Sequence, residues 1–86
     1  MGIFLIHYDL YSRPDVEYPT LIPRLERLGA KRLTSTTWAV KTEKPIAELR
    51  DELEICALTG DRILIAEIRD WRTVNTMIPI DSIADA

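Results

Sequence analysis

Hydrophobic side chains occupy nearly every position of the N-terminal residues 3–10 (IFLIHYDL). This run is too short for a buried helix and is followed by a polar stretch with a proline, so it predicts a central β-strand. Apolar residues then recur at helical spacing over about residues 20–28, and Gly29 provides a helix stop signal. The pattern predicts a first helix with Thr20 as N-cap and with Pro23 in the first turn, where its missing N–H does little harm.

The middle of the chain changes from strand-like to helix-like periodicity. Residues 31–42 alternate and are rich in β-branched side chains, which predicts a hairpin or one long bent strand. Pro45 suits the first position of a second helix, and residues 62–68 (RILIAEI) predict a last central strand. The apolar face expected for the second helix consists of Ile46, Leu49, Leu53 and Cys56. Its water-facing side is expected to carry Glu48, Asp51, Glu52 and Glu54.

The predicted elements follow the order strand, helix, strand, strand, helix, strand. This split βαβ order predicts an α+β fold, namely a ferredoxin-like βαββαβ sandwich whose antiparallel sheet carries both helices on one face. With 86 residues the chain has room for one such domain, which we assign to residues 1–71. Residues 72–86 form a C-terminal tail. Within it, residues 76–80 could pair with a sheet edge, and the last residues could add an edge strand to a partner subunit.

Both faces of the predicted central strands are apolar, which is the clearest physical clue to assembly. In the first strand Ile6 and Leu5 point to opposite faces, and in the last strand Ile65 and Leu64 do the same. Two helices cover only one face, and an uncovered apolar face normally marks an interface, most often of a two-fold homodimer. The alternative is that the C-terminal tail folds over its own sheet. We expect the homodimer.

Composition narrows the class of protein. The net charge of −3 and the pI of about 5.0 argue against a dedicated duplex-binding protein, because phosphate neutralisation favours basic surfaces. The longest apolar run is far shorter than the ~20 residues of a membrane helix and has no basic leader, so we expect no membrane partner. The single cysteine, Cys56, excludes an intrachain disulfide. These features predict a cytoplasmic protein.

Asp9 is the strongest candidate for chemistry. It ends an otherwise apolar strand, where a carboxylate is costly to bury unless it is paired, hydrogen-bonded or bound to metal. It shares strand parity with His7, so both should face the same side. If that side is the dimer face, two copies of Asp9 approach each other and share a proton or hold a divalent cation that activates water. Alternatively, Asp9 caps the loop of residues 11–13.

The remaining candidates each have a structural alternative. We expect His7 to be an interior residue, which is more common for a lone histidine on an apolar strand than a ligand or base. Tyr8 and Trp38 could stack nucleic-acid bases or belong to the core. Arg32 could contact phosphate or lie on a solvated strand edge. The hydroxyl-rich residues 34–37 lack a glycine-rich phosphate cradle and a His/Asp pair, which excludes serine or cysteine covalent catalysis as a hypothesis.

The combination of these residues resembles a known family. An apolar first strand ending in Tyr8-Asp9, a helix closing with Leu28-Gly29, and Arg32 followed six residues later by Trp38 are similar to the CRISPR-associated endonuclease of the adaptation module, "Cas two". The superfamily includes virulence-associated protein D ribonucleases and stand-alone relatives. The stretch of residues 28–40 and the Asp70-Trp71 pair look closest to the stand-alone relatives. The resemblance extends from residue 1 to about Trp71.

The resemblance implies a homodimer of antiviral defence that is either a metal-dependent endonuclease of RNA or DNA or a non-catalytic scaffold that holds duplex DNA. Asp9 matches the family's metal-binding aspartate, which implies Mg²⁺ or Mn²⁺ as cofactor, and Tyr8 lies beside it to position the site. Arg32 and Trp38 match a basic and an aromatic position for nucleic acid. Where CRISPR-associated members carry basic residues at the start of the first helix, this chain has acidic and neutral ones, with only Arg13 nearby.

Two functions follow as hypotheses. The first is a dimeric metal-dependent hydrolase of RNA or DNA, with Asp9 and Tyr8 as catalytic residues and Arg13, Arg32 and Trp38 as nucleic-acid contacts. The second is a non-catalytic homodimeric nucleic-acid-binding or assembly module of a defence or toxin-antitoxin locus. The partner of such a module would be a larger nuclease or an antitoxin. The acidic pI favours the second hypothesis, and an aspartate at the end of an apolar strand favours the first.

Overall fold

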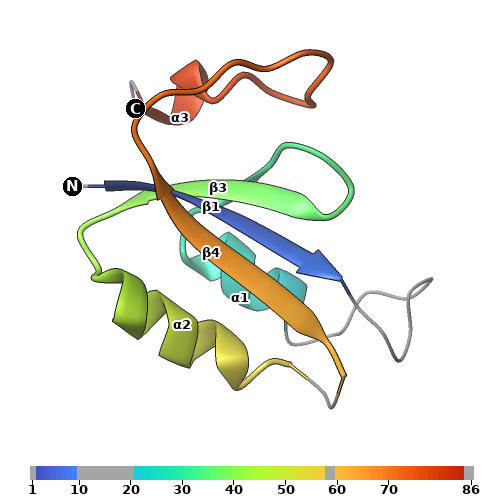
Figure 1. Ribbon diagram of the computed structural model, residues 1–86, viewed down its shortest axis with the longest axis vertical. Helices are drawn as coiled ribbons and strands as arrows, with labels where there is room; N and C mark the ends of the chain where they lie inside the picture. Colours follow the sequence, from blue (N-terminus) through green and yellow to red (C-terminus); the bar gives the residue numbers. More distant parts are fainter. Residues whose placement is uncertain (1, 10–20, 58–59, 85–86) are drawn as a thin grey trace.

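The computed structural model describes residues 2–9, 21–57 and 60–84 (Figure 1). The four strands form one sheet in the order β2-β3-β1-β4, and each neighbouring pair is antiparallel. The predicted α+β class with an antiparallel sheet is therefore confirmed. In chain order the elements are β1 (Gly2–Asp9), α1 (Leu21–Arg27), β2 (Lys31–Arg32), β3 (Thr37–Thr42), α2 (Ile46–Glu54), β4 (Arg62–Ile68) and α3 (Asp81–Ala84).

The first helix ends as its sequence predicts. Gly29 has a φ of 82°, a left-handed conformation that costs glycine little. The N–H of Ala30 donates to the carbonyl of Leu25 at 3.0 Å, and the N–H of Gly29 donates to that of Glu26 at 3.0 Å. This pair of bonds is the Schellman motif, which satisfies carbonyls left over at a helix end. Pro23 lies in the first turn of α1, as predicted. The predicted N-cap Thr20 lies outside the described residues.

Residues 31–42 form a hairpin rather than one bent strand. The two arms are β2 and β3, paired so that Arg32 lies opposite Trp38. The turn between them is closed by the N–H groups of Leu33 and Thr34, which both donate to the carbonyl of Thr37. The N–H of Tyr8 donates to the carbonyl of Thr36 at 3.1 Å, which attaches the turn to β1. This turn therefore lies beside the C-terminal end of β1.

Helices α1 and α2 cover one face of the sheet, as predicted (Figure 1). Of the apolar residues expected on α2, Leu49 and Leu53 are fully buried, and Cys56 just beyond the helix is buried too. Ile46, in the first turn, is instead exposed. The core between helices and sheet contains Phe4, Ile6, Tyr8, Leu21, Leu25, Ala30, Trp38, Val40, Leu49, Leu53 and Cys56.

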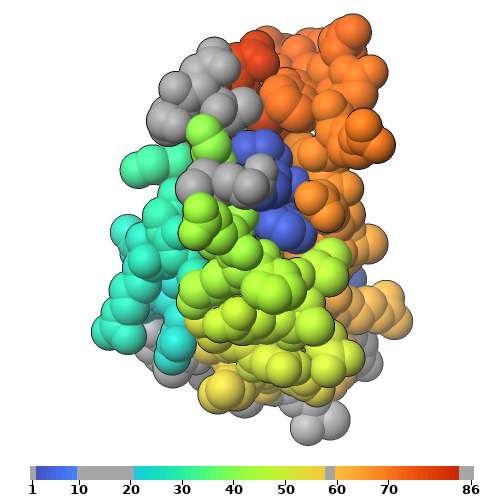
Figure 2. All heavy atoms as spheres, turned by 90° about the vertical axis from the view of Figure 1, so that its left-hand side faces the viewer, coloured from blue at the N-terminus to red at the C-terminus, as the bar shows by residue number. Residues whose placement is uncertain are grey.

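The second face of the sheet is partly covered by the C-terminal tail, so the expectation of a bare face is wrong at this end. Ile80 and Ile83 are buried against Leu33 and Ala39. The N–H of Met77 donates to the carbonyl of Leu33 at 2.8 Å, which pins the tail to the β2–β3 turn. Figure 2 shows the tail at one end of the molecule, beyond α2. Apolar side chains packed around this cluster are Ile3, Leu5, Ile68, Trp71 and Ile78.

The tail is not a strand where the structure describes it. Residues 81–84 form the short helix α3, and residues 76–80 are outside any strand. The arrangement seen is the alternative in which the tail folds over its own sheet, because its isoleucines find apolar partners there. The tail leaves the other end of the same face open. We call this region the open end and define it by His7, Asp9, Thr37, Arg62 and Leu64.

Candidate functional site

Asp9 lies at the open end, on the last position of β1 and directly opposite Arg62 at the start of β4. The Oδ2 atom of Asp9 is 4.0 Å from Nη1 of Arg62, and the two side chains are 65% and 82% exposed. An ion pair this exposed contributes little to stability. Because most of the Asp9 side chain is exposed, its carboxylate is accessible to a cation in solution. The alternative role of Asp9, capping residues 11–13, falls on residues outside those that the structure describes.

His7 shares the open end with Asp9, as strand parity predicts. It is exposed, and its Nδ1 atom lies 2.9 Å from Oγ1 of Thr37, so one ring nitrogen has a neutral hydrogen-bond partner on β3. The expectation of an interior histidine is wrong, because the tail covers the other end of this face and leaves His7 in contact with solvent. The ring stands between Thr37 and Leu64 in the sheet register.

Tyr8 lies on the opposite face from Asp9. Its ring is buried in the helix-side core, and its hydroxyl donates to the carbonyl of Ser35 at 3.2 Å. The same hydroxyl oxygen accepts the indole N–H of Trp38 at 3.4 Å. The sheet therefore separates the Tyr8 side chain from the Asp9 carboxylate, and the two side chains do not share a site.

Arg32 and Trp38 lie together on the helix side of the hairpin. The Cζ atom of Arg32 is 4.7 Å from the centroid of the Trp38 ring, which is a cation–π distance. The indole is buried in the core. The guanidinium of Arg32 occupies the side of the indole on which a base would stack. Arg32 and Trp38 lie on the helix side of the sheet and Asp9 on the other face, so the structure does not bring them together. Arg13, the third predicted nucleic-acid contact, lies outside the described residues.

Among the residues that the structure describes, Asp9 is the carboxylate at the open end. Within residues 2–9, 21–57 and 60–84, no three His, Cys, Asp or Glu side chains are grouped closely enough to hold a metal ion. Mg²⁺ is commonly held by one or two carboxylates and keeps several waters. Asp9 therefore fits a divalent cation best when a second carboxylate, such as that of another copy of the chain, approaches the same face.

Sequence reasoning missed Arg62, which lies opposite Asp9 and forms an ion pair with it. Arg62 begins the last predicted strand, and no local pattern says which residue of another strand will face it. Its pairing depends on the β1–β4 register, in which Tyr8 lies opposite Ile63 and Asp9 opposite Arg62. The site is therefore an exposed Asp9–Arg62 pair next to an exposed histidine and Leu64.

Comparisons of the chain with protein-family models, with curated proteins and with solved structures find no match. Among the described helices, none is long and apolar enough to cross a membrane. The function is therefore inferred from the residues of the open end and from the arrangement of the sheet that presents them.

Proposed function

We propose that this protein is a homodimeric phosphodiesterase of the Cas two-like superfamily that uses Mg²⁺ or Mn²⁺ to hydrolyse RNA or DNA. The observation that carries the proposal is the position of Asp9 at the open end. There an exposed carboxylate stands on a sheet face beside Leu64, a leucine that is 54% exposed. An acidic group next to uncovered apolar surface is the arrangement expected where two copies of a chain meet around a shared ion.

The strand order supports the ferredoxin-like part of the proposal. Helix α1 connects β1 to β2, and α2 connects β3 to β4. In each case the two connected strands are separated in the sheet by one antiparallel strand. This split βαβ order, with both helices on one face, leaves the second face available for other contacts. In this chain the tail takes one end of that face and the open end is left for a partner.

A second copy of the chain is the partner that suits the open end. In a two-fold interface the same patch lies on both subunits, so Leu64 packs near its own counterpart and the copies of Asp9 approach each other. Two carboxylates at close range repel unless they share a proton or hold a cation. The two Asp9 side chains would hold the ion, which would polarise a phosphoryl oxygen of the substrate and activate a water molecule.

Arg62 gives this site a second charge of the opposite sign. With a cation at Asp9, the guanidinium of Arg62 would be free of its 4.0 Å contact with the carboxylate. A guanidinium beside a metal-binding carboxylate is well suited to hold a phosphate oxygen by charge-assisted hydrogen bonds. Arg62 therefore helps to position the scissile phosphate in the proposed reaction.

The same pair of residues also supports the second candidate, a non-catalytic homodimeric binding or assembly module. Arg62 partly neutralises Asp9 within one chain, so the open end could form a dimer interface that needs no metal. The net charge of −3 also favours the non-catalytic candidate over a nuclease, because an acidic protein attracts nucleic acid weakly. In this case the dimer serves as a scaffold for a partner.

Cleavage assays separate the two candidates. Single- and double-stranded RNA and DNA are incubated with the native protein in Mg²⁺, Mn²⁺ or EDTA, and with Asp9→Asn. Loss of a metal ligand should lower the rate on the order of 100-fold or more. The matched control is Asp51→Asn, which removes an exposed carboxylate on α2 and should cut normally. No metal-dependent cleavage by the native protein would support the non-catalytic module.

Sedimentation velocity tests the dimer separately. The native chain should sediment as a dimer at micromolar concentration, and Leu64→Asp should shift it towards monomer. Ile55→Asp, which alters an exposed isoleucine just after α2 on the helix side, should leave the dimer intact. A monomeric native protein would contradict both the two-fold metal site and the non-catalytic dimer interface.

A further inference from the structure

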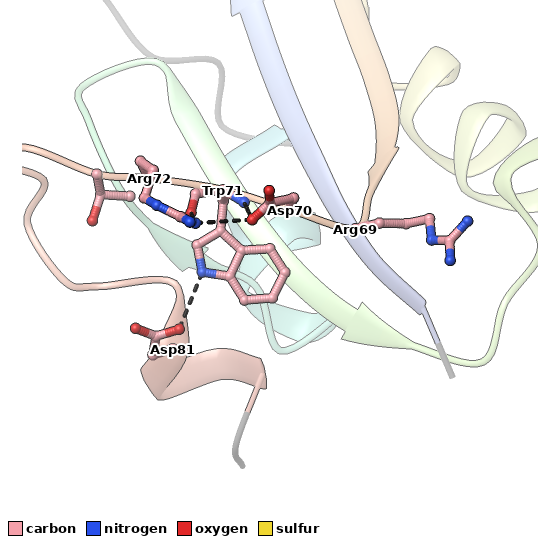
Figure 3. Close-up of a pocket in the computed structure, with 6 residues that line it drawn as sticks. Arg69, Asp70, Trp71, Arg72 and Asp81 are labelled. Carbon is pink, nitrogen blue, oxygen red and sulfur yellow. Dashed lines mark hydrogen bonds and ion pairs between the residues drawn. The ribbon is translucent and has the colours of Figure 1, made fainter.

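A polar pocket lies just beyond the end of β4, away from the open end (Figure 3). Its volume is about 490 Å³, which is within the range of ~300–1,000 Å³ typical of small-molecule sites. Asp9 faces the first residue of β4, whereas the pocket starts directly after the last one. It is lined by Arg69, Asp70, Trp71, Arg72, Thr73 and Asp81.

The indole of Trp71 is held by a hydrogen bond to the C-terminal tail, and its backbone is held by the neighbouring Asp70. Its Nε1–H donates to Oδ1 of Asp81, at the start of α3, at 3.1 Å. Its backbone N–H donates to Oδ1 of Asp70 at 2.9 Å. The ring also packs against the apolar cluster on the second face. Trp71 therefore presents a fixed aromatic surface in the pocket, so little conformational entropy is lost when a flat ligand binds.

Two arginines line the pocket. Nη1 of Arg72 donates to Oδ1 of Asp70 at 2.9 Å and to the carbonyl of Trp71 at 2.6 Å. Both contacts use one terminal nitrogen of a group with five N–H donors, which matches the geometry of phosphate oxygens. Arg69 also lines the pocket, but Figure 3 shows its side chain extending away from Trp71. The pocket thus combines an aromatic ring, cations and carboxylate acceptors.

We propose that the Trp71 pocket binds a nucleotide unit, with its base against the indole and its phosphate held by Arg72. Stacking on an aromatic ring and a charge-assisted contact to phosphate are the two interactions that recognise unpaired nucleotides. The carboxylates of Asp70 and Asp81 are acceptors for the N–H groups on the edge of a base. Guanine offers two adjacent N–H donors on that edge and suits a carboxylate best. A purely apolar ligand is disfavoured by the charged lining.

This site is independent of the proposed catalysis, since it uses none of the residues at the open end. It adds a place where single-stranded nucleic acid or a free nucleotide is recognised. The Asp70-Trp71 pair, which contributed to the family resemblance without a role, acquires one here.

The test is NMR titration of the ¹⁵N-labelled native protein with GMP, with UMP and with inorganic phosphate. The chain has two tryptophans and so two indole N–H signals, which Trp71→Phe assigns. GMP should shift the Trp71 signal saturably and leave that of the buried Trp38 unchanged, with UMP weaker because its ring is smaller. No shift, equal shifts of both signals, or the same saturable shift with inorganic phosphate would overturn the proposal.

Variants then locate the contacts. Trp71→Ala should weaken GMP binding on the order of 10-fold or more, which corresponds to the loss of one stacked base. Arg72→Gln alters an exposed side chain, so folding is preserved, and it should weaken GMP binding as well. Arg50→Gln, on the distant exposed side of α2, should not. Asp9→Asn should bind GMP normally, so that failure of the nuclease hypothesis and failure of this one are distinguishable. Unchanged binding in both Trp71→Ala and Arg72→Gln would refute the site.

Discussion

Docking of the C-terminal tail can be tested by truncating one side chain, in Ile80→Ala. Ile80 is only 3% exposed, and it belongs to the buried cluster on the second face together with Leu33 and Ala39. The substitution removes three carbon atoms from that cluster and leaves a cavity under the tail. This cluster separates the sheet from solvent at this end. The loss of stability in Ile80→Ala therefore measures how strongly the tail packs on the second face.

The magnitude follows from burial. Isoleucine-to-alanine substitutions in a well-packed core cost about 2–5 kcal/mol, of which part is lost transfer free energy and part is the cavity. The tail can also undock while the rest of the fold stays intact, and the loss of global stability cannot exceed the free energy of docking. We therefore expect a value near the lower end, about 2 kcal/mol.

Urea unfolding followed by far-UV circular dichroism measures this loss. With a slope of about 1–3 kcal/mol/M, the midpoint should fall by roughly 0.7–2 M while the slope stays the same. The matched control is Val74→Ala, which shortens a side chain that is 85% exposed in the same tail. If Ile80→Ala and Val74→Ala unfold within about 0.5 kcal/mol of each other, the tail does not cover the second face in solution, and the reasoning is refuted.

Two further predictions concern local structure. Gly29→Ala should destabilise the fold by about 1 kcal/mol in the same urea assay, because its φ of 82° disfavours a Cβ even though no atom lies within 4 Å to clash with one. An unchanged midpoint would mean that α1 ends differently in solution. Glu52→Gln removes the ion pair with Lys44 and should cost less than about 1 kcal/mol, with the difference shrinking in high salt, because both side chains are partly exposed. A larger, salt-independent loss would show that Glu52 has a packing role.

Part of the candidate site was predictable from the sequence. Alternation along β1 correctly puts Asp9 and His7 on one face and Tyr8 on the other, since strand parity needs only the backbone geometry of consecutive residues. The exposure of His7 was not predictable, because it depends on which part of the sheet the tail covers. The pairing of Asp9 with Arg62 depends on a register between strands more than fifty residues apart in the chain.

The Trp71 pocket was likewise predictable from the sequence only in part. The sequence contains the Asp70-Trp71 pair, but nothing local indicates that Asp81, ten residues later, accepts the indole N–H. That contact forms because Ile80 and Ile83 bury themselves on the sheet and bring the start of α3 back to the end of β4. Apolar burial is non-directional, so a run of isoleucines predicts that the tail will be buried without saying where.

The sequence by itself therefore determined the order of strands and helices as far as β4, the end of α1 at Gly29 and the two apolar faces of the sheet. These features depend on side-chain periodicity and on backbone preferences, which act over a few neighbouring residues. Only the tertiary structure decided what lies on the second face: the tail over Leu33 and Ala39 at one end, and the exposed Asp9 and Arg62 at the other. The physical reason is that an apolar face requires cover but does not specify it, and long-range packing makes the choice.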